Sequence, residues 1–339
     1  MSGNHDDGAR AGGAGGPLEI ACDESGSDGE NLTGGNTDVF AHAGVHVSVT
    51  AAAAAVREIR DRIRSPAEEY KANHLLREKH RAVLEWLLAP GGPIHGRAHV
   101  HLTEKSFFVV DRVVSLLLDD PAEAVPLFRA GPADVGEDGW RAFLRAANQV
   151  LRMRNGGEPG TSVPLFFGTV DALREAHPGT RAARSLERLA ARRDRAEAYR
   201  AGLLDGSAVR IPVLNPLLPA IISTAAYWGA GGRPVRLVHD RQNVLTPERL
   251  AWIERTARLD GTALVGVRLV AARADPRVQL ADFLAGIARK VASDELHGRG
   301  DPVLTGLLRA YVAPESVWGD ARSWTGLGAG AAPAAHGTG

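Results

Sequence analysis

Short apolar runs of strand length alternate with longer helical stretches, and this alternation limits the fold of the chain more than any other feature. The first run, LEIACD at residues 18–23, carries apolar side chains at every second position, a period typical of a β-strand. Similar runs occupy residues 39–49, 97–103, 234–240 and 262–270. Strands alternating with helices predict an α/β fold, a mixed sheet flanked by helices, whose first two strands form a hairpin with a long loop.

Helical patterns fill the intervals between these runs. Helices are expected at residues 50–64 with Thr50 as N-cap, at 66–89, at 107–118, after the Thr246–Pro247 cap, and at 278–296. Residues 120–205 are nearly all helical in pattern, which predicts a helical insertion in, or divergent region of, a single domain spanning residues 17–316. Residues 1–16 and 317–339 are predicted to be disordered tails, since Gly- and Ala-rich sequence dominates both ends.

Charge and cysteine content narrow the range of partners and compartments. Forty Lys and Arg residues balance forty Asp and Glu residues, so nucleic-acid binding would require a local basic patch. Cys22 is the only cysteine, which excludes an intramolecular disulfide and suits a reducing compartment. The start of the chain does not resemble a secretory signal, and no apolar run reaches the roughly 18 residues of a membrane span. We therefore expect a cytoplasmic protein without a membrane partner.

Three aspartates occupy positions typical of a functional site. Asp23 and Asp240 each end an apolar strand, and in open α/β sheets ligands bind outside the carboxyl ends of the strands. Asp282 interrupts an apolar helix face, where an unpaired carboxylate costs several kcal/mol unless it is compensated. Two alternatives stay open at this point: a strand-end Asp is often a turn former, and a buried Arg or Lys would neutralise Asp282 as well as a metal ion.

Carboxylates that converge from separate elements form hard-oxygen sites suited to Mg²⁺ or Mn²⁺. Two such ions can stabilise both the attacking and the leaving oxygen of a phosphodiester. This chemistry requires oxygen ligands and water but neither a cysteine nor a nucleophilic triad.

Four short motifs together resemble the bacterial family called domain of unknown function 3800, which is placed in the RNase H-like superfamily. They are ACDESGS at residues 21–27, EYK at 69–71, VHD at 238–240 and VQLAD at 278–282. The resemblance covers residues 18 to about 295 and is clearer at the two ends than in the middle. It implies an RNase H-like mixed sheet flanked by helices.

The resemblance also implies roles for individual residues. Asp23, Glu69, Asp240 and Asp282 would bind the divalent metal, and Lys71 would hold a phosphate or the attacking water. Supporting roles fall to Glu24, Ser25, Gly26 and Gln279. The implied activity is a divalent-metal-dependent nuclease or related phosphodiester hydrolase. The alternative is a catalytically inactive RNase H-like module that binds nucleic acid or a protein, and a helical Glu such as Glu69, beside Lys71, is often simply solvated.

A histidine pair, the single cysteine and an arginine-rich segment could each be functional or merely structural. His99 and His101 would share one strand face and form a transition-metal pair, although no third ligand follows at a recognisable spacing. Cys22 fits a small buried hydrophobic residue better than a nucleophile. The segment 180–200, predicted as one helix, carries seven arginines against three acids and is either a nucleic-acid contact or a solvated face. The sequence gives no indication of the oligomeric state.

Overall fold

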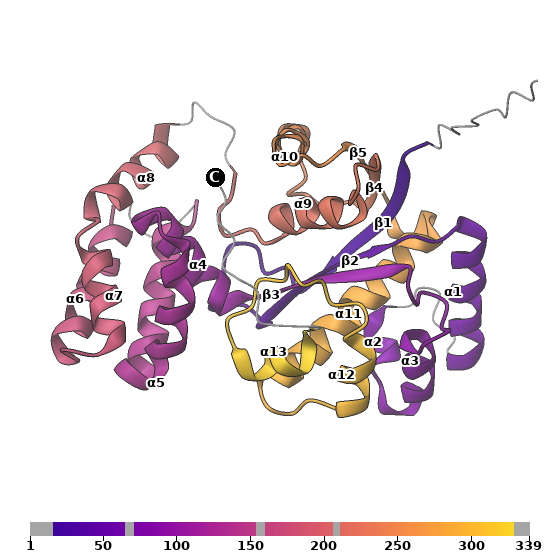
Figure 1. Ribbon diagram of the computed structural model, residues 1–339, viewed down its shortest axis with the longest axis horizontal. Helices are drawn as coiled ribbons and strands as arrows, with labels where there is room; N and C mark the ends of the chain where they lie inside the picture. The colour runs from indigo at the N-terminus through magenta and orange to yellow at the C-terminus, as the bar shows by residue number, and fades with distance from the viewer. Residues whose placement is uncertain (1–15, 65–70, 154–159, 206–210, 329–339) are drawn as a thin grey trace, which may run out of the picture.

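The computed structural model describes residues 16–64, 71–153, 160–205 and 211–328 (Figure 1). The strands are β1 (Leu18–Ser25), β2 (Val39–Val45), β3 (Ala98–Glu104), β4 (Val235–Asp240) and β5 (Leu264–Val270). The α-helices are α1 (Val49–Ile63), α2 (Ala72–Leu75), α3 (Arg81–Leu88), α4 (Lys105–Leu118), α5 (Ala124–Leu151), α6 (Ser162–Ala176), α7 (Arg181–Ala190), α8 (Arg193–Asp205), α9 (Leu217–Trp228), α10 (Pro247–Leu259), α11 (Pro276–Leu296), α12 (Pro302–Leu308) and α13 (Ala321–Leu327). Short 3₁₀ turns form η1 (Glu78–His80), η2 (Pro121–Glu123) and η3 (Ala272–Ala274).

The five strands form one mixed sheet in the order β3-β2-β1-β4-β5. β2 runs antiparallel to both β1 and β3, whereas β4 is parallel to both β1 and β5. In the central strand, Cys22 pairs with Gly44 on one side and with His239 on the other. The predicted α/β fold with a mixed sheet is therefore confirmed, and so is the hairpin of the first two strands.

Helices cover both faces of this sheet (Figure 1). On one face, Ala41, Ala43 and Val45 of β2 pack into a core shared with α1, α3 and α11. On the opposite face, Ile20 and Cys22 of β1 pack against α9 and α10. Side chains along a strand point alternately to the two faces, so the strands are buried on both sides.

Helices α4 to α8 form a separate helical unit beside the sheet (Figure 1). Their own hydrophobic core includes Phe108, Phe143 and Phe166. The unit follows β3 directly, because α4 begins at Lys105. Within the described ranges, no helix is long and apolar enough to cross a membrane.

Local boundaries differ from three expectations. Ser48, not Thr50, caps α1, and its Oγ accepts a hydrogen bond from the Ala51 amide at 3.1 Å. The helix expected at 66–89 is replaced by α2, η1 and α3, and residues 65–70 lie outside the described part of the chain. The segment 180–200 forms two helices, α7 and α8. Residues 191 and 192 form a turn between them; both helices contact α4 and α6, and α7 also contacts α5.

The prediction of a disordered tail from residue 317 is wrong for residues 317–328. Strand β3 lies at the edge of the sheet, where its backbone groups need partners. The Val317 amide donates to the Leu102 carbonyl at 2.8 Å, and Trp318 is only 1% exposed. This segment therefore protects the sheet edge and adds α13 to the core. The remaining tail predictions concern residues 1–15 and 329–339, which lie outside the described residues.

Candidate functional site

The carboxyl ends of β1 and β4 bring Asp23 and Asp240 together. Each aspartate follows directly on the Cys22–His239 pair in the parallel register of these two strands. Two residues earlier in each strand, Ala21 and Val238 pack together on Val278 of α11. Because strand side chains repeat every two residues, both aspartates face α11.

Asp282 lies on the same helix, one turn beyond Val278, and joins this group. We call Asp23, Glu24, Asp240 and Asp282 the carboxylate cluster. Its members come from two strands and one helix that are far apart in the sequence. The structure therefore brings together the three aspartates that the sequence singled out.

Burial and mutual repulsion determine the ionisation of Asp23, which is 5% exposed. Burial raises the pKa of its carboxyl to about 9, with repulsion by Glu24 and Asp282 adding to the effect. The Glu24 amide donates to Asp23 Oδ1 at 2.8 Å, which acts in the opposite direction because it favours the ionised form. Asp23 forms no ion pair with any cation of the described residues. The site thus concentrates carboxyl groups where water is scarce, and the raised pKa means that Asp23 holds a proton at neutral pH.

Glu24 belongs to this cluster, although the sequence indicated only a supporting role. Burial raises the pKa of its carboxyl to about 8, and repulsion by Asp240 contributes. Its side chain is 6% exposed, and Oε2 lies 3.9 Å from His239 Nε2. Oε2 has no hydrogen-bond partner among the described residues. A buried carboxylate oxygen without a donor is costly, so Glu24 is poised for an additional positive or proton-bearing partner.

Gln279 and Asp240 hold the same short turn, η3. The Ala272 amide donates to Asp240 Oδ1 at 2.8 Å, and Gln279 Nε2 donates to the Ala272 carbonyl at 3.4 Å. Gln279 therefore supports the loop that orients Asp240. This contact gives a physical reason for a Gln three residues before Asp282.

The turn after β1, which follows Asp23 and Glu24 in the chain, contacts an arginine of α11. Gly26 has a φ of +88°, and a Cβ there would lie 2.4 Å from the Val39 carbonyl oxygen, so the turn requires glycine. The Arg289 Nε donates to Ser25 Oγ at 3.0 Å. Arg289 is half-buried and forms no ion pair with an acid of the described chain. Burial lowers the pKa of its guanidinium.

Sequence reasoning missed Arg289, although a signal was available. Arg289 follows Asp282 by seven residues, or two helical turns, and therefore lies on the same face of α11. Its role depends on a contact with β1 that sequence spacing alone does not reveal.

Lys71 and Glu69 belong to the EYK motif, of which the structure describes only the lysine. Lys71 immediately precedes α2, which packs against α11. A Cβ at Gly286 would lie 2.2 Å from the Ala72 Cβ and 3.9 Å from Ser25 Oγ. Lys71 therefore starts a helix that lies close to the turn after β1. Glu69 lies outside the described residues.

Two buried histidines, His42 and His239, lie on the face of the sheet opposite to Asp23 and Asp240, which is the face of Glu24 by strand alternation. His239 Nδ1 donates to the Asp240 carbonyl at 2.8 Å, because a carbonyl oxygen can only accept. Burial lowers the pKa of both rings, so His239 is neutral and its Nε2 accepts from His42 Nε2 at 3.2 Å. His42 Nδ1 then accepts from the Thr224 hydroxyl at 2.8 Å. This chain of hydrogen bonds fixes the end of β4 that carries Asp240.

His99 and His101 share one face of β3, as the sequence predicted, and both are buried. Trp228 Nε1 donates to His99 Nδ1 at 2.9 Å, and the Tyr227 ring stacks on His99 with 4.4 Å between centroids. Burial lowers the pKa of His99 to about 3. Aromatic packing therefore accounts for His99. Cys22 is also buried, as predicted.

A preformed metal cage is not found in the part of the chain that the structure describes: no three His, Cys, Asp or Glu side chains there are already arranged to hold an ion. Comparison with protein-family models, with curated proteins and with solved structures gave no match. The resemblance to the domain of unknown function 3800 family therefore stays a prediction.

Proposed function

We propose that this chain is a divalent-metal-dependent nuclease, or related phosphodiester hydrolase, with an RNase H-like arrangement of its catalytic acids. Asp23, Asp240 and Asp282 would hold Mg²⁺ or Mn²⁺. The observation that carries the proposal is their convergence from two strand ends and one helix at a buried point. Like charges collected there need a counter-charge, and a divalent cation supplies it.

The carboxylate cluster matches a divalent cation in two respects, the sign of its charge and the type of its donor atoms. All four members of the cluster offer carboxylate oxygens, the ligands that Mg²⁺ and Mn²⁺ prefer. The raised pKa values of Asp23 and Glu24 indicate that protons satisfy this need when no cation is bound. Glu24 Oε2, which lacks a hydrogen bond to any described residue, is a further available oxygen.

Each residue then has a defined task. The metal, when bound, supplies an activated water and stabilises charge on the leaving oxygen. The Ala272 amide and the His239 bond to the Asp240 backbone keep that carboxylate in place. Arg289, whose Nε bonds Ser25 two residues after Asp23, would supply positive charge for a substrate phosphate. Lys71 serves the same end, and Glu69 would be a fourth ligand, both on the strength of the family resemblance.

Nucleic acid is the proposed substrate, with the exposed arginines of α7 and α8 as additional contacts. The second candidate is the inactive module that binds nucleic acid or a protein without cutting. It is favoured by the location of these arginines in a helical unit with its own core, separate from the carboxylates. The two candidates differ in whether binding leads to cleavage.

A cleavage assay separates them. Fluorophore- and quencher-labelled single- and double-stranded DNA and RNA are incubated with the full chain and Mg²⁺ or Mn²⁺. We expect cleavage that EDTA stops and that Asp23→Asn and Asp282→Asn each reduce by at least about a hundredfold, because a metal ligand is removed. Asp61→Asn is the matched control, since Asp61 is an exposed side chain of α1.

The outcomes are distinct. If Asp23→Asn cleaves as fast as the wild type, the carboxylate assignment is wrong. If the wild type binds labelled strands by fluorescence anisotropy but cleaves none of them under any metal condition, the inactive module is the better account.

A further inference from the structure

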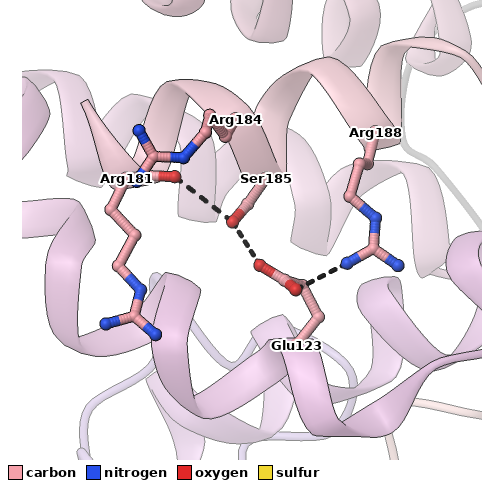
Figure 2. Close-up of a pocket in the computed structure, with 5 residues that line it drawn as sticks. All are labelled: Glu123, Arg181, Arg184, Ser185 and Arg188. Atoms are coloured by element: carbon pink, nitrogen blue, oxygen red, sulfur yellow. Dashed lines mark hydrogen bonds and ion pairs between the residues drawn. The ribbon is translucent and has the colours of Figure 1, made fainter. Parts of the chain in front are cut away.

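One face of α7 presents three arginines to a surface cavity. Arg181, Arg184 and Arg188 are spaced by three and four residues and therefore project from the same side of the helix. Together with Ser185 and Glu123 of η2, they line a cavity of about 370 Å³ (Figure 2). We call this cavity the arginine pocket. It belongs to the helical unit and shares no residue with the carboxylate cluster.

The single carboxylate in the arginine pocket is already satisfied. Glu123 Oε1 accepts from Ser185 Oγ at 2.5 Å, and Oε2 accepts from Arg188 Nη1 at 2.6 Å (Figure 2). The other terminal nitrogen of Arg188 bonds Asp120 Oδ2 at 2.7 Å. Two acids therefore fix the side chain of Arg188 at the side of the pocket.

The other two arginines keep their charge available. Arg184 Nη1 donates to the Gly179 carbonyl at 2.9 Å, which leaves its second terminal nitrogen unused by that bond. Neither Arg181 nor Arg184 forms an ion pair with an acid among the described residues. Both side chains are exposed. Like charges at this spacing repel each other, and an anion between them would relieve the repulsion.

We propose that the arginine pocket binds phosphate groups. Guanidinium groups recognise phosphate oxygens bidentately, and the lining holds three arginines against one carboxylate. None of the five lining residues is aromatic, so the pocket has no platform for a base and recognises the phosphates themselves. Its volume of about 370 Å³ is larger than a single phosphate group needs. Such phosphates come either from a free di- or triphosphate or from a nucleic-acid backbone.

The test measures binding without catalysis, in EDTA. The full chain is titrated with inorganic pyrophosphate by calorimetry and with a labelled single-stranded oligonucleotide of about 12 nucleotides by fluorescence anisotropy. The variant is Arg181→Gln/Arg184→Gln. The matched control is Arg255→Gln/Arg258→Gln, which removes two exposed arginines at the same spacing from α10. Circular dichroism checks that both variants are folded.

We expect affinity for at least one probe to fall roughly tenfold in the Arg181/Arg184 variant and to be unchanged in the control. If the variant binds only pyrophosphate more weakly, the ligand is a free di- or triphosphate. If it binds only the oligonucleotide more weakly, the ligand is the nucleic-acid backbone. If it binds both more weakly, the pocket recognises phosphate groups from either source. A wild type that binds neither probe, or a variant that binds as tightly as the control, overturns the proposal. Asp61→Asn, a variant of an exposed residue of α1, should bind both probes normally. The titrations are made in EDTA and measure no cleavage, so failure of the hydrolase proposal would leave this one standing.

Discussion

The carboxylate cluster and the arginine pocket both gather like charges, but they do so under opposite conditions. Asp23 is 5% exposed, and burial is the first cause of its raised pKa. Arg181 and Arg184 are exposed on α7, where water and salt screen their repulsion. The carboxylates are held by a sheet and a packed helix, whereas the arginines project from one helix face.

The difference shows how the surroundings determine what a charged group needs. In a buried cluster, the charges must be removed by protons or balanced by a tightly held cation. On the surface, the same repulsion costs little, so the groups stay ionised and attract anions at long range. Under the two proposals, the carboxylate cluster would bind a cation strongly and locally, and the arginine pocket would bind an anion more weakly and in a salt-dependent way.

The largest expected effect concerns stability and pH. A buried carboxyl whose pKa is raised in the folded state binds a proton that the unfolded chain has released. Stability is therefore lost as pH rises from about 4 through the folded value, which is about 9 for Asp23. In metal-free buffer, Asp23→Asn should be more stable than the wild type by roughly 2 kcal/mol or more at pH 8, and the gain should shrink towards pH 4.

Urea unfolding from pH 4 to 9 measures this gain, with Asp61→Asn as the exposed control. A wild type whose stability is flat over this range, or an Asn variant that is less stable at pH 8, would show that Asp23 is not under electrostatic stress.

A smaller effect is expected from divalent metal. Mg²⁺ or Mn²⁺ at about 10 times its dissociation constant should stabilise the wild type by roughly 1.4 kcal/mol, because only the folded state collects the carboxylates. Thermal unfolding followed by circular dichroism should show an increase in Tm for the wild type and a much smaller one for Asp282→Asn. Equal increases in both proteins would place the metal elsewhere on the chain.

The smallest effect belongs to the arginine pocket. Arg181→Gln/Arg184→Gln should change the free energy of unfolding by no more than about 0.5 kcal/mol per substitution, as is usual for exposed side chains. Oligonucleotide affinity of the wild type should fall steeply with salt, and the slope should be shallower in the variant by roughly one unit for each phosphate that it no longer binds. A large drop in the free energy of unfolding of this variant would mean that Arg181 and Arg184 stabilise the fold, which contradicts the view that they are exposed groups available to a ligand.

Sequence patterns predicted the sheet well because apolar periodicity is a local property. The runs ending in Asp23 and Asp240 form β1 and β4, and Thr246 caps α10 as expected. The break between α7 and α8 was missed, because residues 191 and 192, a turn in the structure, are alanine and arginine and continue the helix-forming pattern of the sequence. The order of residues 317–328 was missed as well, since it depends on the unpaired edge of β3.

In the candidate site too, local features were predictable from the sequence, whereas contacts across the fold were not. Strand ends and an acid on an apolar helix face pointed to the three aspartates, whereas the sheet register brings them together. Glu24 and Arg289 gain their positions from burial and from contacts across the fold. The His42–His239 bond joins two strands that flank β1 but are 197 positions apart in sequence. Spacing along the chain could not predict it.

A crystal structure of the full chain soaked in Mn²⁺, with anomalous scattering recorded to locate the ion, would show whether the carboxylate cluster binds metal. We expect Mn²⁺ bound by carboxylate oxygens of Asp23, Asp240 and Asp282, at the carboxyl ends of β1 and β4. Carboxylates that bind no Mn²⁺ at saturating concentration, or an ion bound only elsewhere, would contradict this expectation.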